Sequence, residues 1–126
     1  MDAPPHEATV LVVDDDEDIR TVFRHGLGHL GYRVITAATG VEGLRSAQEE
    51  HPDVVLMDLS IRGADAWEVV RCLKAAEETR DIPIVLVTGH TDLDRRAKAE
   101  GCAAYLAKPV RLEVLRTVVD KLVRRR

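Results

Sequence analysis

Short apolar runs alternate five times with longer segments in which apolar residues recur at helical spacing. Three of the runs are apolar at every position over four residues, which is typical of strands covered on both faces. These uninterrupted stretches are residues 10–13, 54–57 and 84–87. The five runs that we predict to be strands are residues 9–13, 33–37, 54–58, 83–88 and 103–107.

The segments between these runs are predicted to be helices, because their apolar residues fall on one stripe. Thr39, with Glu42 three residues later, has the pattern of a capping box, and Asp65 is placed to cap the third helix. Gly31 and Gly101 follow the first and fourth helices, where glycine commonly ends a helix. In the last helix, the residues expected to be buried are Leu112, Leu115, Val118, Val119 and Leu122. The five predicted helices span residues 17–30, 39–50, 65–78, 92–100 and 111–124.

Strands that alternate with helices in this way predict an α/β fold built from βαβ units with right-handed crossovers. The strands would form one parallel, doubly wound sheet with helices on both faces. At 126 residues the chain has the length of one domain. We expect a flexible N-terminus over residues 1–8 and one folded domain over residues 9–126.

The composition narrows the class of protein further. The chain is 45% hydrophobic but only 3% aromatic, so its core must be mainly aliphatic. A formal net charge of -4 argues against nucleic-acid binding by bulk electrostatics. Two cysteines without a CxxC pattern suit a reducing compartment, and the sequence has neither a signal peptide nor an apolar run of membrane-spanning length. We therefore expect a soluble, cytoplasmic domain.

A run of five acidic residues, 14–18, follows the first predicted strand directly. Two carboxylates about 5 Å apart repel each other by on the order of 3 kcal/mol at an effective dielectric near 20. Asp16, Glu17 and Asp18 are suited to cap a helix and to occupy its first turn, where the helix dipole stabilises acids. Helix capping does not account for Asp14 and Asp15. The closeness of these two negative charges indicates a bound cation or a chemical reaction at this place.

Other polar residues follow other strands. Asp58 ends the third predicted strand, Thr88 ends the fourth, and Lys108 follows the fifth. In an open parallel sheet, ligands bind outside the carboxyl ends of the strands. If the first and third strands are neighbours, Asp14, Asp15 and these three side chains converge on one edge of the sheet.

Four stretches together resemble the receiver domain of two-component response regulators, of the chemotaxis-regulator type. They are "VLVVDDDEDIR" (10–20), "DVVLMDLSIRGADAWEVV" (53–70), "IPIVLVTGH" (82–90) and "GCAAYLAKPV" (101–110). The resemblance covers the chain from residue 9 to the last helix, in the family's order. It implies a flavodoxin-like fold with strand order 2-1-3-4-5, and a receiver domain over residues 9–126.

The resemblance also implies a cofactor and a metal site. Mg²⁺ would be held by Asp15, Asp58 and the backbone carbonyl of Ser60, with Asp14 reaching it through water. Mg²⁺ prefers hard oxygen ligands and keeps several waters, so few protein ligands suffice. It would reduce the repulsion between a carboxylate and an anionic phosphoryl group.

The family's chemistry implies roles for five residues. Asp58 would accept a phosphoryl group from the phosphohistidine of a histidine kinase or histidine phosphotransfer protein. Lys108, Thr88 and the backbone of Gly89 would bind the phosphate, and Lys108-Pro109 would be a cis peptide bond. Thr88 and Tyr105 would act as the switch.

Switching is expected to remodel the face formed by the fourth helix, fifth strand and fifth helix. This face would bind a downstream protein target and is also a candidate homodimer surface. No direct contact with nucleic acid or membrane is expected. The chain would not be an enzyme, since it would phosphorylate itself once and lose the phosphate slowly.

The chain departs from the family pattern in three places, of which one is Gly89, where the family usually has Ala. The loop after the phosphoacceptor usually carries Pro and Gly, and here those positions correspond to Arg62 and Ala66. The segment from Thr88 to Tyr105 is about two residues shorter than usual in the family, which trims the fourth helix or its entry loop.

The same sequence also offers alternative interpretations. A pseudo-receiver that only binds partners remains open. A Mg²⁺-dependent phosphatase of the haloacid-dehalogenase type would need Thr or Val where Asp18 stands. The GxGxxG letters at residues 26–31 close a helix instead of opening one, and His25 and His29 lack a third metal ligand.

Overall fold

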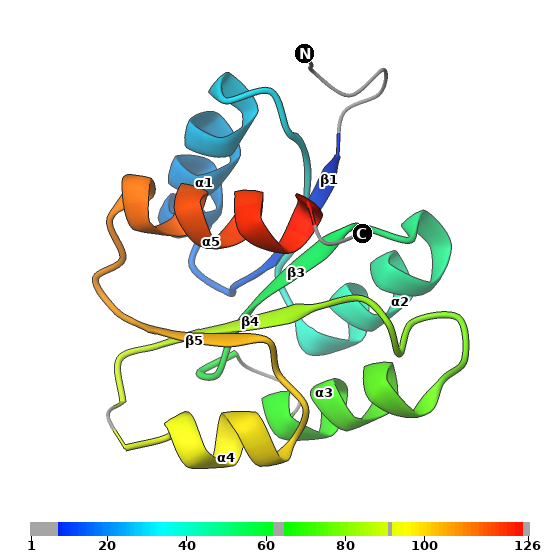
Figure 1. Ribbon diagram of the computed structural model, residues 1–126. Coiled ribbons are helices and arrows are strands. Elements are labelled where there is room, and N and C mark those ends of the chain that lie inside the picture. Colours follow the sequence, from blue (N-terminus) through cyan, green and yellow to red (C-terminus); the bar gives the residue numbers. More distant parts are fainter. Residues whose placement is uncertain (1–7, 62–64, 91, 125–126) are drawn as a thin grey trace.

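The computed structural model describes residues 8–61, 65–90 and 92–124. Over these ranges five parallel strands form one sheet in the order β2-β1-β3-β4-β5 (Figure 1). The strands are β1 Thr9–Val13, β2 Arg33–Ala37, β3 Val54–Asp58, β4 Ile84–Thr88 and β5 Ala104–Ala107. The helices are α1 Glu17–His29, α2 Gly40–Glu50, α3 Ala66–Ala75, α4 Asp94–Ala99 and α5 Leu112–Arg124. The predicted fold class and strand order are confirmed.

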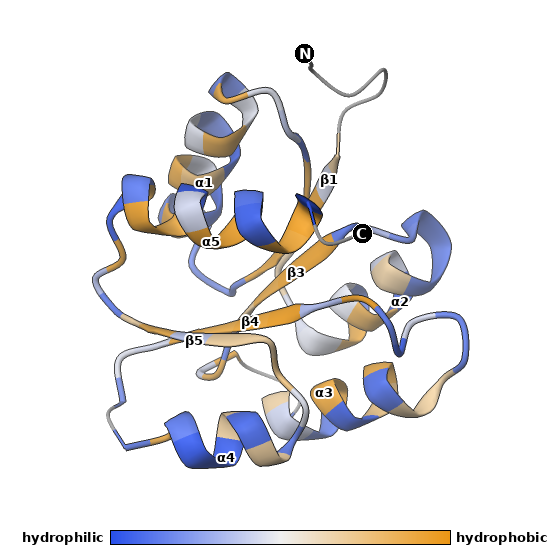
Figure 2. Cartoon of the chain, viewed as in Figure 1, coloured by the Kyte–Doolittle hydropathy of each residue, from blue (hydrophilic) through white to orange (hydrophobic). Residues whose placement is uncertain are grey.

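Helices cover both faces of the sheet. α1 and α5 lie on one side and α2, α3 and α4 on the other (Figure 1). Two hydrophobic clusters result, one for each side. β1, β3 and β4 are buried at every residue, as their uninterrupted apolar sequences predict. Figure 2 shows these central strands as strongly hydrophobic and the helices as hydrophilic on their outward sides.

Three helix N-termini are capped as the sequence predicts. Asp16 accepts hydrogen bonds from the Asp18 and Ile19 N–H groups at the start of α1. Thr39 accepts from Glu42 at α2, and Asp65 accepts from the backbone N–H of residue 67 at α3. These caps satisfy N–H groups that have no partner within their own helix.

α3 ends at Ala75, three residues before its predicted end. The backbone of Ala76 is extended, and the buried Thr79 hydroxyl donates to the Leu73 carbonyl over 2.7 Å. The Lys74 ammonium donates to the carbonyls of two residues beyond the helix, Arg80 and Ile82. These contacts between residues six to eight positions apart end the helix, although the sequence itself would allow it to continue.

α4 is also shorter than predicted, because Asp92 has a φ of 66° and so cannot join a right-handed helix. The helix is fixed to α3 by side chains. The Arg96 guanidinium lies over the Trp67 ring, 4.3 Å from its centroid, and Arg71 pairs with Glu100 over 3.0 Å.

Two residues near the ends of predicted segments have other environments than the sequence predicts. Leu112, expected to be buried, begins α5 and is 38% exposed. Ala8 is buried, and its carbonyl accepts a hydrogen bond from the Arg33 N–H, so it extends the β1–β2 pairing. Residues 1–7, the rest of the segment expected to be flexible, lie outside the described residues.

Two helix glycines should respond oppositely to alanine. In α2, a Cβ on Gly43 would lie 2.8 Å from Cγ2 of the buried Val13, so we expect Gly43→Ala to destabilise the fold by roughly 1–3 kcal/mol. In α1, a Cβ on Gly28 would meet nothing within 4 Å, so Gly28→Ala should stabilise it by roughly 0.5 kcal/mol. Urea denaturation measures both. A Gly43→Ala protein as stable as Gly28→Ala would contradict this packing.

The two cysteines should differ in reactivity. Cys72 is exposed, whereas burial raises the pKa of the Cys102 thiol to about 11. Since the thiolate is the nucleophile, we expect iodoacetamide at pH 8 to alkylate Cys72 at least about tenfold faster. Peptide mapping over time measures both rates, and urea-unfolded protein is the control in which they should converge. Equal rates in the folded protein would contradict the burial of Cys102.

Candidate functional site

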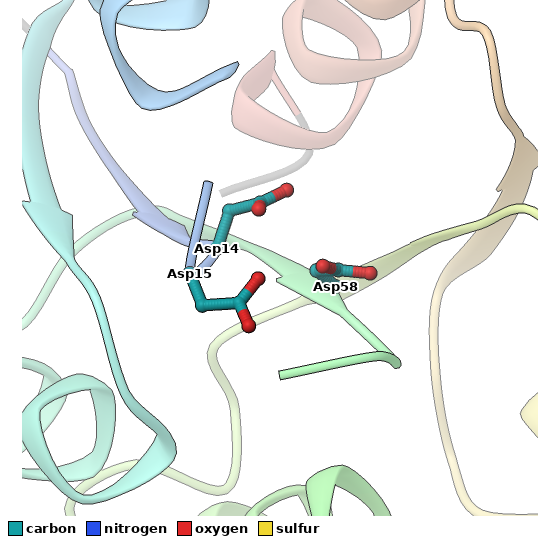
Figure 3. A group of neighbouring side chains, drawn as sticks. All are labelled: Asp14, Asp15 and Asp58. Atoms are coloured by element: carbon teal, nitrogen blue, oxygen red, sulfur yellow. The ribbon is translucent and has the colours of Figure 1, made fainter. Parts of the chain in front are cut away.

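Three carboxylates meet at the carboxyl end of the sheet. Oxygens of Asp14, Asp15 and Asp58 all lie within 4.8 Å of one another (Figure 3). The register explains this arrangement, because Val13 of β1 is paired with Met57 of β3 and the acids come next along each strand. The predicted convergence of the two strand ends is therefore confirmed.

The two buried acids of this cluster are held by backbone groups. Asp14 is 2% exposed and Asp58 is 3% exposed. Asp14 Oδ1 accepts from the Asp16 N–H over 2.9 Å, and Asp58 Oδ1 accepts from the Ser60 N–H over 3.0 Å. The Asp14 N–H donates to the Ala37 carbonyl of β2 over 3.1 Å. Both side chains are thus fixed in place before any ligand binds.

Lys108 brings a positive charge to these acids. Its ammonium nitrogen lies 3.3 Å from Asp58 Oδ1 and 3.6 Å from Asp14 Oδ2. Its backbone N–H donates to the Thr88 carbonyl over 2.7 Å, which fixes the end of β5 against β4. The Lys108-Pro109 peptide bond is cis, as expected from the family resemblance. One ammonium against three carboxylates leaves an excess of negative charge.

This excess affects the protonation of Asp14. Burial raises the pKa of Asp14 most, the neighbouring Asp58 and Asp15 raise it further, and the Asp16 N–H and the Lys108 ammonium lower it. A raised folded-state pKa contributes stability that is complete below the unfolded pKa of about 4 and is lost as pH rises through the folded pKa. Ionised Asp14 therefore makes the fold less stable than protonated Asp14 does, and a bound cation would offset that cost.

Thr88 and Gly89 lie along the same edge of the sheet, whereas Tyr105 lies within β5, opposite Leu86 of β4. Thr88 is the last residue of β4 and is fully buried. It follows Val87, which is paired with Asp58 in the register of β3 and β4. Its Oγ1 accepts from the His90 N–H over 3.1 Å, and the Tyr105 hydroxyl donates to the His90 carbonyl. The exposed backbone of Gly89 lies between these groups.

The loop that departs from the family pattern is described only in part. Arg62 lies outside the described residues, whereas Ala66 is the first residue of α3 and is 2% exposed. A small, buried side chain therefore starts α3. No other group of three potential metal ligands occurs within the described ranges, and His25 and His29 are exposed on α1.

Sequence reasoning did not single out Arg20. Its Nη1 donates to the backbone carbonyl of Asp14 over 2.7 Å. This contact joins residues six apart across the turn between β1 and α1, so it depends on the shape of the turn. No periodicity or motif in the sequence indicates it.

Comparison with known proteins identifies the family. Residues 10–120 match the response regulator receiver domain family. The chain belongs to this family. Its receiver domain is thus a component of two-component signalling, and this match favours the receiver over the phosphatase alternative. Within the described ranges, no helix has both the length and the apolar character needed to cross a membrane.

Named relatives show how far the similarity extends. The receiver domain is 36% identical over 104 residues to the polar-differentiation response regulator DivK of Brucella ovis, which covers 81% of this chain and 85% of DivK. It is 37% identical over 128 residues to the transcriptional regulatory protein PrrA of Mycobacterium tuberculosis, which covers all of this chain. The chain spans only 54% of PrrA, about half the length of that relative.

A solved structure shows a similar domain with a metal. The receiver domain of the sensor histidine kinase PA1611 from Pseudomonas aeruginosa has a TM-score of 0.85 and 31% identity. The alignment covers 93% of this chain and 98% of that one. That structure is described as having a magnesium ion coordinated in the active site cleft.

Proposed function

We propose that this receiver domain accepts a phosphoryl group on Asp58 from the phosphohistidine of a histidine kinase or histidine phosphotransfer protein. The observation that carries the proposal is the cluster of Asp14, Asp15 and Asp58 within 4.8 Å, with the Lys108 ammonium 3.3 Å from Asp58. A carboxylate held beside a cation at a sheet edge is suited to in-line attack on phosphorus.

The donor set fits Mg²⁺. All the side-chain donors are carboxylate oxygens, which are the hard ligands that Mg²⁺ prefers. Asp15, Asp58 and the Ser60 carbonyl would hold the ion, and Asp14 would reach it through water. When bound, the ion neutralises charge on the carboxylates and on the incoming phosphoryl oxygens. The magnesium-bound PA1611 receiver supports this assignment.

The chain's own residues perform the transfer. An Asp58 oxygen forms a bond to phosphorus while the bond from phosphorus to the partner's imidazole nitrogen breaks, and that nitrogen keeps the electron pair. Lys108 offers its charge to the phosphoryl oxygens. Thr88 Oγ1 already accepts from the His90 N–H, so its own hydrogen is available to donate to phosphate, as is the N–H of Gly89.

Phosphorylation would then switch the output face. It adds nearly two negative charges next to Thr88. Movement of Thr88 towards the phosphate would release Tyr105, which now donates to the His90 carbonyl, and would shift the face formed by α4, β5 and α5. That face would bind a downstream protein or a second copy of the chain. We place the domain in the cytoplasm, as a phosphoacceptor and not an enzyme with turnover.

The test uses a small phosphodonor such as acetyl phosphate. Wild-type protein incubated with donor and Mg²⁺ should gain the mass of one phosphoryl group per chain, measured on the intact protein. EDTA should prevent the gain, and hydroxylamine should remove the label, as expected for an acyl phosphate. A chain that stays unlabelled with both donor and Mg²⁺ present would support the pseudo-receiver alternative instead.

A further inference from the structure

Arg20 joins α1 to the turn that carries two of the clustered acids. It is the fourth residue of α1, and its backbone N–H donates to the Asp16 carbonyl over 3.1 Å within the first helical turn. From there its guanidinium reaches back, and Nη1 donates to the Asp14 carbonyl over 2.7 Å in a half-buried position. The rigid start of a helix therefore anchors the backbone next to the carboxylate cluster.

This anchor matters because the sheet stops holding the chain at Asp14. β1 ends at Val13, and the Asp14 N–H still pairs with the Ala37 carbonyl of β2. The Asp14 carbonyl belongs to the peptide unit that joins Asp14 to Asp15. Since a peptide unit is planar, fixing that carbonyl also fixes the N–H of Asp15 and the position of the Cα from which its side chain starts.

An arginine side chain is well suited to hold the Asp14 carbonyl in one position. A guanidinium is always charged and presents its donors in a rigid plane, so it holds one geometry better than an ammonium does. A hydrogen bond from a charged donor is also roughly twice as strong as a neutral one. Around metal sites, groups that orient the ligands commonly set the affinity of the site.

We propose that Arg20 is a positioning residue for the divalent-cation site: it holds the peptide between Asp14 and Asp15 so that the Asp15 carboxylate faces Asp58. Arg20 contacts neither cation nor phosphate and acts through the backbone. The inference rests on the proposed function, because it concerns the same cation.

The experiment compares Arg20→Met and Arg20→Lys with Arg24→Met. Arg24 lies one turn further along α1 and is exposed, so this control makes the same change of charge and shape away from the turn. Mg²⁺ affinity is measured on the full chain without phosphodonor, from the rise in unfolding midpoint with Mg²⁺ concentration. With donor, the labelling rate is measured across a range of Mg²⁺ concentrations.

We expect Arg20→Met to weaken Mg²⁺ binding roughly tenfold and Arg20→Lys to weaken it about threefold. The labelling rate of Arg20→Met at saturating Mg²⁺ should stay within about twofold of wild type, because the reacting groups are intact. Arg24→Met should bind Mg²⁺ as the wild type does. A purely structural role for Arg20 would lower the metal-free stability without this selective loss of affinity.

The outcomes separate this inference from the function on which it rests. Wild-type Mg²⁺ affinity in Arg20→Met, or a loss no larger than in Arg24→Met, overturns the positioning role and leaves the proposed function standing. If Arg20→Met does not fold, an unchanged Mg²⁺ affinity in Arg20→Lys would equally overturn the positioning role. A wild-type chain that binds no Mg²⁺ overturns both.

Discussion

Replacing Asp58 with asparagine is expected to abolish phosphoryl labelling of the chain while making the metal-free fold more stable. Asparagine keeps the shape of the side chain and can still accept from the Ser60 N–H, which Asp58 Oδ1 does now over 3.0 Å. Its amide oxygen is neutral and does not form an acyl phosphate. The loss should therefore be complete within the detection limit of intact mass measurement.

The gain in stability follows from the charges around position 58. Asp58 is buried beside Asp14 and Asp15, and the Lys108 ammonium is shared between Asp14 and Asp58. Removing one of the three charges relieves two repulsions and the cost of burying a carboxylate, against one lost ion pair. We expect a net gain of roughly 1 kcal/mol at neutral pH, measured by urea denaturation without metal.

A matched control lies close by. Asp65 is exposed, caps α3 and undergoes the same chemical change in Asp65→Asn. Asparagine caps helices as well as aspartate does, so labelling and stability should both stay near wild type. Equal labelling of Asp58→Asn and wild type, or a phosphoryl group mapped to another residue, would remove Asp58 from its proposed role.

The second large effect is expected from Asp15→Asn. Asp15 is the least buried acid of the cluster, and it lies beyond the end of β1 where it can turn towards a cation. Loss of its charge should weaken Mg²⁺ binding by about a hundredfold, since the number of anionic ligands largely sets the affinity of such sites. The metal-free stability should rise by roughly 1 kcal/mol, because repulsion from Asp14 and Asp58 is relieved.

Both effects can be read from one titration. The unfolding midpoint is followed as Mg²⁺ is added, so that the metal-free value and the metal-dependent rise come from the same protein. Asp18→Asn is the control, because Asp18 is an exposed first-turn acid of α1 and its loss changes net charge equally. Unchanged Mg²⁺ affinity in Asp15→Asn would show that this side chain is not a ligand.

Much of the fold could be predicted because local sequence and tertiary environment agree. Uninterrupted apolar runs become the fully buried strands β1, β3 and β4, and polar caps such as Thr39 and Asp65 begin helices. The meeting of Asp14, Asp15 and Asp58 followed from the rule that parallel strands end at one edge. The strand order itself required the family resemblance.

The features that were missed depend on individual side-chain contacts and not on repeating local patterns. The predicted continuation of α3 failed because Lys74 donates to carbonyls beyond the helix and Thr79, beyond the helix, donates back to the Leu73 carbonyl inside it. Leu112 lies on the apolar stripe of α5, but it is the first residue of that helix. Its side chain packs over Gly26 of α1, where solvent still reaches it. The Arg20 contact crosses a turn of irregular shape, which no sequence periodicity describes.

The stacking of Arg96 on Trp67 gives the molecule a built-in optical probe. Trp67 is the chain's one tryptophan, it is 9% exposed, and its ring touches a charged group from α4. Indole emission responds to a nearby charge and to water, so sliding of α4 along α3 would change both brightness and colour. Stopped-flow fluorescence in unlabelled protein could therefore test and time the movement that we propose for the output face, milliseconds after donor is mixed in.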